Sequence, residues 1–186
     1  MLFVRLAGLT LPLWIVGGWS AAEAAIFFIV ADVPISWIAV RRGTRAAMLA
    51  AVVAALASAL GAATLWLWFA QAPLAATASV VALPGIDSKT LATAGAIYDR
   101  GYAAIILASF QGIPFKLFVL EAAERGEWLI LILAPLLRLP RFLGVAFLVG
   151  TLSRFLGRLL NSNQRLALLL VAWIAFYGWY WSVMPR

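Results

Sequence analysis

The sequence contains no cysteine and no histidine. Without these residues the chain cannot form disulfides, thiol nucleophiles, Ser-His-Asp triads or zinc sites built from His and Cys. Its seven acidic residues are scattered and lack the clustered spacing of an all-carboxylate magnesium site. No glycine-rich phosphate-binding loop occurs. We therefore expect a protein that is not an enzyme and that has no catalytic residues, metal or cofactor.

Charge is also scarce. Only 11% of the residues are charged, while 66% are hydrophobic and the mean hydropathy is +1.04. No charged residue lies between Ala46 and Ile86 or between Leu166 and Pro185, and each stretch can hold the roughly 20 apolar residues of a spanning helix. The net charge of +7 is spread singly beside apolar runs, which favours membrane topology over nucleic-acid binding. We predict an all-α integral membrane protein with a single polytopic domain over 1–186.

Two short apolar segments, one in each half, are broken by a proline with a charge nearby. The first, from Glu23 to Trp37, contains Asp32 and Pro34, and the second, over 106–118, contains Pro114 and Lys116. Their arms are too short to cross a bilayer, and broken membrane helices are tolerated only where they line a cavity or are buried in protein. We predict two re-entrant helical hairpins over 22–40 and 101–124, turning at Pro34 and Pro114. Glu23 and Asp32 are expected on the first arm of the first hairpin, and Lys116 just past the second turn.

The remaining chain is interpreted from its apolar runs and breaks. The first apolar run looks like a secretion signal, but we interpret it as an uncleaved helix over 6–20. Long spans are predicted over 46–69, 128–153 and 166–184, a loop over 70–88, and a short interfacial helix over 88–100.

The loop charges suggest an orientation. If each hairpin returns to the side from which it entered, six arginines share one face without any acid: Arg41, Arg42, Arg45, Arg154, Arg158 and Arg165. The positive-inside rule makes that face cytoplasmic. The two hairpins then enter from opposite sides, as in an inverted repeat with half-repeats at about 20–70 and 100–160.

Arg138 and Arg141 lie in the middle of the span over 128–153. An arginine at the bilayer centre costs from ~3 to more than 10 kcal/mol, and the i, i+3 spacing lets both point into the bundle. Together with Lys116 they outnumber Glu23 and Asp32 by one charge. Three interpretations follow: a structural ion-pair network, a site for an anionic group bound by the arginine forks and the lysine, or a proton or ion pathway.

At these residues the chain resembles the DedA superfamily (VTT domain, SNARE-associated Golgi protein-like), and particularly its short YqaA-like branch. The matching segments are Glu23 to Pro34, Arg42-Gly-Thr-Arg45, Ser58-Ala-Leu-Gly61, Gly112 to Phe118 and Arg138-Leu-Pro-Arg141-Phe. By position, Glu23, Asp32, Arg138 and Arg141 look like the functional acidic and arginine residues of the family, and Lys116 like the lysine of the branch. The chain departs from the pattern at Val30-Ala31, where the branch usually has a proline, and at Pro140, which interrupts the arginine motif.

The resemblance implies two opposed re-entrant hairpins and the transport or scrambling of polyprenyl phosphates or phospholipids. We therefore expect a multi-pass flippase or scramblase of the bacterial cytoplasmic (inner) membrane, either proton-coupled or not. Its expected partners are lipids with anionic head groups and further copies of itself, but no nucleic acid. The alternatives are a proton-coupled exporter of small cations or drugs and a membrane scaffold that transports nothing.

Overall fold

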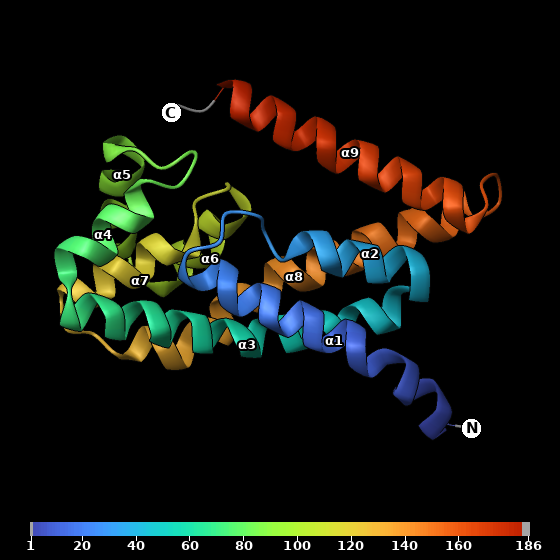
Figure 1. The fold of residues 1–186 in the computed structure, drawn as a ribbon, viewed down its shortest axis with the longest axis horizontal. Coiled ribbons are helices and arrows are strands. Elements are labelled where there is room, and N and C mark those ends of the chain that lie inside the picture. Colours follow the sequence, from blue (N-terminus) through green and yellow to red (C-terminus); the bar gives the residue numbers. More distant parts are fainter. Residues whose placement is uncertain (1, 184–186) are drawn as a thin grey trace.

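The computed structural model describes residues 2–183, with side chains from residue 10 onward. Over this range the chain is helical and contains no strand (Figure 1). Its nine helices are α1 (Leu2–Ala25), α2 (Asp32–Arg42), α3 (Thr44–Gln71), α4 (Pro73–Val81), α5 (Ser88–Tyr98), α6 (Tyr102–Phe110), α7 (Phe115–Glu124), α8 (Leu129–Leu156) and α9 (Ser162–Val183). The predicted all-α class is confirmed.

Within the described part of the chain, three helices are long and apolar enough to cross a membrane. They are α3 and α8, with 28 residues each, and α9, with 22 residues. At about 1.5 Å per residue all three exceed the roughly 30 Å of a hydrocarbon core. They coincide with the three long spans predicted from the sequence, and α8 continues unbroken through Pro135 and Pro140. The fold is therefore that of a membrane protein.

Two pairs of shorter elements form helical hairpins. The C-terminal part of α1 and α2 flank a turn over 26–31, and α6 and α7 flank a turn over 111–114. Gly112 has a φ of +85°, which a residue without a Cβ adopts easily, and Pro114 directly precedes α7. A turn therefore directly precedes α7 at Pro114, at the position where the sequence predicted one. Both turns lie near the middle of the long axis of the molecule (Figure 1).

The first hairpin differs from its prediction. α1 runs unbroken to Ala25, so the helix predicted over 6–20 and the first arm of the hairpin are one element. The turn is not at Pro34, which is the third residue of α2. A proline fits the first turn of a helix because the N–H that it lacks would have no partner there. Glu23 and Asp32 consequently lie on opposite sides of the turn, not on the same arm.

The connection between the two halves contains more helix than predicted. The loop expected over 70–88 includes α4, which starts at Pro73, again in the first turn of a helix. The helix predicted over 88–100 is present as α5. Its N-cap Asp87 accepts a hydrogen bond from the Thr90 backbone N–H at 2.7 Å and one from the Thr90 hydroxyl at 2.6 Å. These bonds hold the pKa of Asp87 below its ordinary value.

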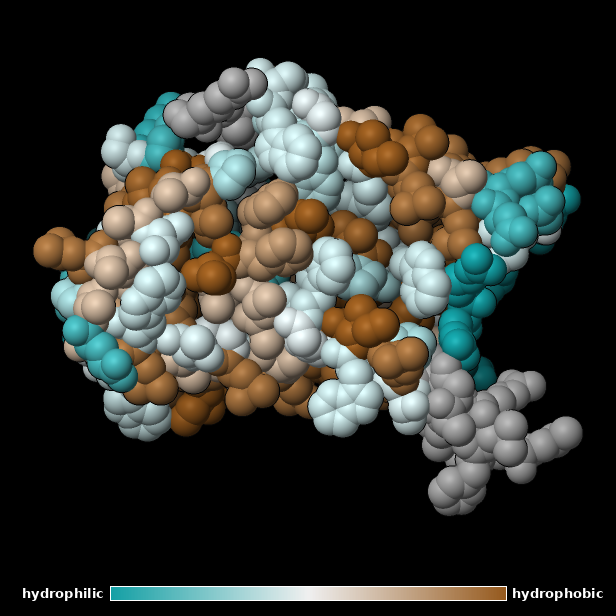
Figure 2. All heavy atoms as spheres, in the orientation of Figure 1, coloured by the Kyte–Doolittle hydropathy of each residue, from teal (hydrophilic) through white to brown (hydrophobic). Residues whose placement is uncertain are grey.

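Polar and charged residues gather at the two ends of the long axis. The turn between α2 and α3 lies beside the end of α8, where Arg154 Nη2 donates to Thr44 Oγ1 at 3.4 Å. In Figure 2 this arginine-rich end is the hydrophilic patch at the right. At the opposite end Arg125 forms an ion pair with Asp99 at 2.6 Å. The six arginines predicted to share a face lie in or beside the turns that join α2 to α3 and α8 to α9.

The apolar interior is divided into two clusters. One gathers buried residues of α7 with the second half of α3 and the first half of α8, up to Leu137. The other gathers α2 with the first half of α3 and the second half of α8, from Phe142 onward. We call the boundary between the clusters the seam. On α8 the seam falls at residues 138–141, so Arg138 and Arg141 lie between two apolar cores.

Candidate functional site

Five charged side chains meet at the seam. They are Glu23 from α1, Asp32 from α2, Lys116 from α7, and Arg138 and Arg141 from α8. All but Arg141 are buried. The elements bring them together because each hairpin turns near the middle of the molecule, beside the midpoint of α8 (Figure 1). The sequence predicted that Asp32, Lys116, Arg138 and Arg141 converge if the hairpin tips meet, and the structure places Glu23 beside them as well.

Arg138 and Glu23 form the deepest ion pair. Arg138 Nη2 donates to Glu23 Oε2, and the two side chains are 6% and 5% exposed. The guanidinium also lies over the rings of Phe115 and Phe142, with its Cζ 5.3 Å and 4.7 Å from their centroids. Its second terminal nitrogen, Nη1, is buried and has no hydrogen-bond partner. The charges of Arg138 and Glu23 therefore balance, but one hydrogen-bond donor of Arg138 remains unsatisfied.

Arg141 and Asp32 form a second pair. Arg141 donates to Asp32 Oδ2 from Nε at 3.0 Å and from Nη2 at 2.5 Å, while its Nη1 donates to the Ser109 carbonyl at 2.9 Å. This one guanidinium therefore ties the start of α2 to the end of α6. Asp32 is the first residue of α2, where the positive end of the helix dipole favours a carboxylate. Arg141 is 22% exposed, more than any other member of the two pairs.

Among the described residues, Lys116 has no carboxylate partner within ion-pair distance. Its side chain is only 3% exposed, and its Nζ donates to the Phe27 carbonyl at 2.9 Å. That bond joins the second hairpin to the turn of the first. Because Arg138 and Arg141 balance Glu23 and Asp32, Lys116 leaves the seam with one surplus positive charge.

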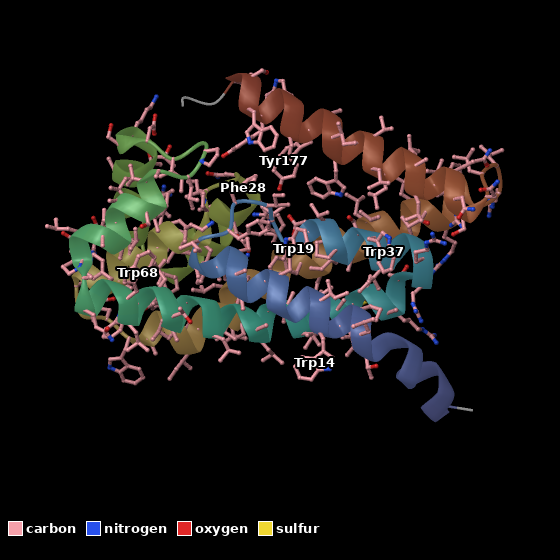
Figure 3. The ribbon with its side chains drawn as sticks, viewed as in Figure 1. Trp14, Trp19, Phe28, Trp37, Trp68 and Tyr177 are labelled. Atoms are coloured by element: carbon pink, nitrogen blue, oxygen red, sulfur yellow. The ribbon has the colours of Figure 1, made fainter. Side chains whose placement is uncertain are left out.

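The first turn is held from two sides. Trp19 Nε1 donates to the Ile29 carbonyl at 3.0 Å, and the Val30 N–H donates to the Tyr177 hydroxyl at 2.9 Å. Figure 3 shows Trp19 on one side of this turn and Tyr177 on the other, reaching down from α9. A second hydrogen bond joins α9 to α2, where Trp173 Nε1 donates to Ser36 Oγ at 3.0 Å. The last helix therefore anchors the first hairpin at its turn and along its second arm.

A cavity of about 1000 Å³ opens above the seam, between α9 and the rest of the bundle. All five seam charges line it, together with the second turn and Pro114. Its remaining wall is mostly apolar and aromatic and comes mainly from one face of α8 and one face of α9, with contributions from the first turn, α2 and the connection between α4 and α5. Pro34 lines a separate surface pocket with Leu11 and Trp37 instead. Of the two predicted turn prolines, only Pro114 belongs to the cavity.

The sequence prediction missed the contribution of α9. Trp173, Phe176, Tyr177 and Tyr180 all line the cavity. Their spacing, i, i+3, i+4 and i+7, is the signal that places four aromatic rings on one helix face. Ser109 was also missed, because it contributes a backbone carbonyl, which no residue type reveals.

No group of three or more acidic side chains that could hold a metal ion occurs within the described part of the chain. What the seam offers chemically is paired carboxylates, fork-shaped cations and one extra ammonium group at the base of an apolar cavity. Arginine and lysine donors in such a setting suit an anionic oxygen ligand.

No family model, curated protein or solved structure matches this chain. The resemblance to the DedA superfamily accordingly rests on its motifs.

Proposed function

We propose that this protein is a lipid flippase or scramblase of the DedA type, which binds an anionic head group at the seam and moves it across the membrane. Arg138, Arg141 and Lys116 bind the head group, and Glu23 and Asp32 balance the arginines between transport cycles. The two hairpins are re-entrant and enter from opposite sides as an inverted repeat. The arginine-rich end faces the cytoplasm, in accord with the positive-inside rule.

The observation that carries this proposal is the surplus positive charge at the base of the cavity. A buried ammonium without a counter-ion is costly in a low-dielectric site. Lys116 is buried with no carboxylate within ion-pair distance among the described residues, and Arg138 Nη1, on a residue that lines the same cavity, lacks an acceptor. A phosphate oxygen bound there would neutralise the Lys116 ammonium and accept a hydrogen bond from Arg138 Nη1.

The shape and lining of the cavity support a lipid over a small soluble anion. Five charged side chains lie at its base in the seam, while the walls along α8 and α9 between the seam and Arg165 are mostly apolar. An amphiphile satisfies both regions at once, since its head group meets the cations and its chain replaces water along the walls. A free anion would leave the apolar walls wet.

A test uses Lys116→Met, which removes the surplus charge and keeps the apolar stem. Because Lys116 has no acidic partner, this change leaves no carboxylate unpaired, and folding should be preserved. We expect transfer of fluorescent phosphatidylglycerol between the leaflets of reconstituted vesicles to slow by about tenfold or more, the loss typical of one charged hydrogen bond. Lys89→Met, on the exposed face of α5, is the matched control and should transfer lipid at the parent rate.

Two results would contradict the proposal. One is a parent protein that transfers no lipid in vesicles where it is correctly folded. The other is a Lys116→Met variant that transfers anionic lipid as fast as the parent.

One observation favours a second candidate, the proton-coupled exporter of small cations. Asp32 Oδ1 is buried, accepts no hydrogen bond and belongs to a residue that lines the cavity. A cationic substrate or a proton could bind this oxygen. Under this alternative, the same vesicles show efflux of a lipophilic cation driven by a pH gradient, and Lys116→Met does not reduce that efflux.

A further inference from the structure

The cavity extends from the seam toward the arginine-rich end of the molecule. On α8 it is lined from Arg138 and Arg141 as far as Ser153 and Leu156. Twelve residues separate Arg141 from Ser153, which corresponds to about 18 Å along the helix. On the opposite wall the lining of α9 begins at Arg165. The seam charges therefore occupy one part of a long cavity, and another cation lies at a distant part.

Between these cations the α8 wall is apolar. Gly144, Val145, Leu148, Val149 and Leu152 line it, at spacings of three and four residues that form one helix face. Leu168, Leu169 and Ala172 provide the facing wall on α9. Such a path can seat a hydrocarbon chain along its whole length.

Arg165 resembles Lys116 in having no acidic partner within ion-pair distance among the described residues. Its Nη1 donates to Ser153 at 2.8 Å, both to the carbonyl and to the hydroxyl, and its Nε is buried without a partner. It also lies in the first turn of α9, where the helix dipole disfavours a positive charge. An anion beside Arg165 would offset that dipole and accept a hydrogen bond from the unpartnered Nε–H.

We infer that Arg165, held by Ser153, forms a second binding position for the anionic head group of a lipid whose chain lies along the cavity. This inference rests on the proposed function and adds a stage to it. The head group binds at Arg165 near the arginine-rich end and at Arg141 and Lys116 in the seam, and it passes between them while its chain stays on the apolar walls. Charge complementarity and the apolar walls together select a lipid as the occupant.

The test exploits the absence of cysteine from the chain. A single Val149→Cys substitution puts one thiol on the cavity wall of the full-length protein. Its rate of modification by neutral N-ethylmaleimide is measured in vesicles of phosphatidylglycerol and in vesicles of phosphatidylcholine with the same chains. The ratio of the two rates within each variant cancels any effect of the substitution on the thiol itself. We expect phosphatidylglycerol to slow the modification by about tenfold.

Arg165→Gln should abolish this protection, and Arg165→Lys should retain most of it because the charge remains. Arg158→Gln is the matched control, since Arg158 is exposed, lies over the Phe155 ring and does not line the cavity. In the Arg158→Gln variant, phosphatidylglycerol should slow modification of the thiol as much as in the parent. The inference is overturned if phosphatidylglycerol gives no protection, or if Arg165→Gln is protected like the parent, as expected of a residue that only ties α9 to α8. Protection that persists in a protein unable to transfer lipid would overturn the proposed function and leave this binding position intact.

Discussion

Arg138 and Lys116 are both buried cations of the seam, yet the chain satisfies them differently. Arg138 has a carboxylate partner and two aromatic rings, whereas Lys116 has one backbone carbonyl. Removing one partner of a buried ion pair leaves an uncompensated charge, while removing an unpaired cation leaves none. Replacing Arg138 by a neutral side chain of similar length should therefore destabilise the fold, whereas the same replacement of Lys116 should leave it folded.

We expect Arg138→Met to lower the free energy of unfolding by about 3–5 kcal/mol, because the Glu23 carboxylate stays buried without its partner. The double variant Arg138→Met/Glu23→Gln should recover most of this loss. Chemical unfolding in detergent micelles measures both. If Arg138→Met alone were as stable as the parent, Glu23 would have to reach water, and the Arg138–Glu23 pair would not be buried in the seam.

At the residue scale the sequence predicted that Asp32 and three cations converge if the hairpin tips meet, but not which carboxylate pairs with which arginine. Intramembrane charge is costly enough that five such residues are expected to share one site. Which carboxylate meets which arginine depends on the turn between α1 and α2, and that turn was predicted at Pro34. Once the turn lies over 26–31, Glu23 and Asp32 come from different helices, and each contacts its own arginine.

At the scale of elements, α1 is positioned by its close approach to α3. A Cβ built on Gly61 would collide with the Ala21 carbonyl and would lie 2.9 Å from the Ala24 side chain. Small residues allow such approaches between membrane helices. Because Glu23 lies between Ala21 and Ala24 on α1, this contact also sets the depth at which Glu23 meets Arg138.

We expect Gly61→Ala to destabilise the protein by about 1–3 kcal/mol, since the new methyl group forces the two backbones apart. Lipid transfer should also fall, as α1 carries Glu23 away from the seam. Gly18→Ala is the control on α1, because Gly18 is exposed and its Cβ would meet no atom within 4 Å. Equal stability and equal transfer in both alanine variants would show that the α1–α3 contact does not position the site.

Element boundaries were predicted well where composition changes sharply and poorly where proline was the only signal. α3, α8 and α9 follow long uncharged or nearly uncharged runs, and their existence could be inferred from the sequence alone. Proline marks a turn as readily as the first turn of a helix, and here Pro114 lies in a turn before α7 whereas Pro34 lies in the first turn of α2. Pro73 was read as part of a loop for the same reason, although it starts α4.

At the scale of the whole molecule, α9 was predicted only as a last span, yet it forms one wall of the cavity. Its apolar surface is largely exposed, and it contacts the first hairpin through hydrogen bonds from its aromatic face. Tyr180 adds a bond to the Pro84 carbonyl at 3.3 Å, in the connection between the two halves. Periodicity could have revealed the aromatic face, but not the backbone groups that it meets, since these depend on how two distant segments fold together.

These contacts lead us to expect that Tyr177 holds α9 against the turn that carries the seam. Tyr177→Phe keeps the ring and removes the only acceptor seen for the Val30 N–H among the described residues. Hydrogen exchange of the Val30 amide should then accelerate by about tenfold, the equivalent of one net hydrogen bond, without loss of helix content. Tyr180→Phe removes a longer, exposed bond from the same helix and should leave this amide unchanged. If exchange at Val30 is equal in the parent and in both variants, α9 does not restrain the turn, and the cavity is open on this side without any movement of the last helix.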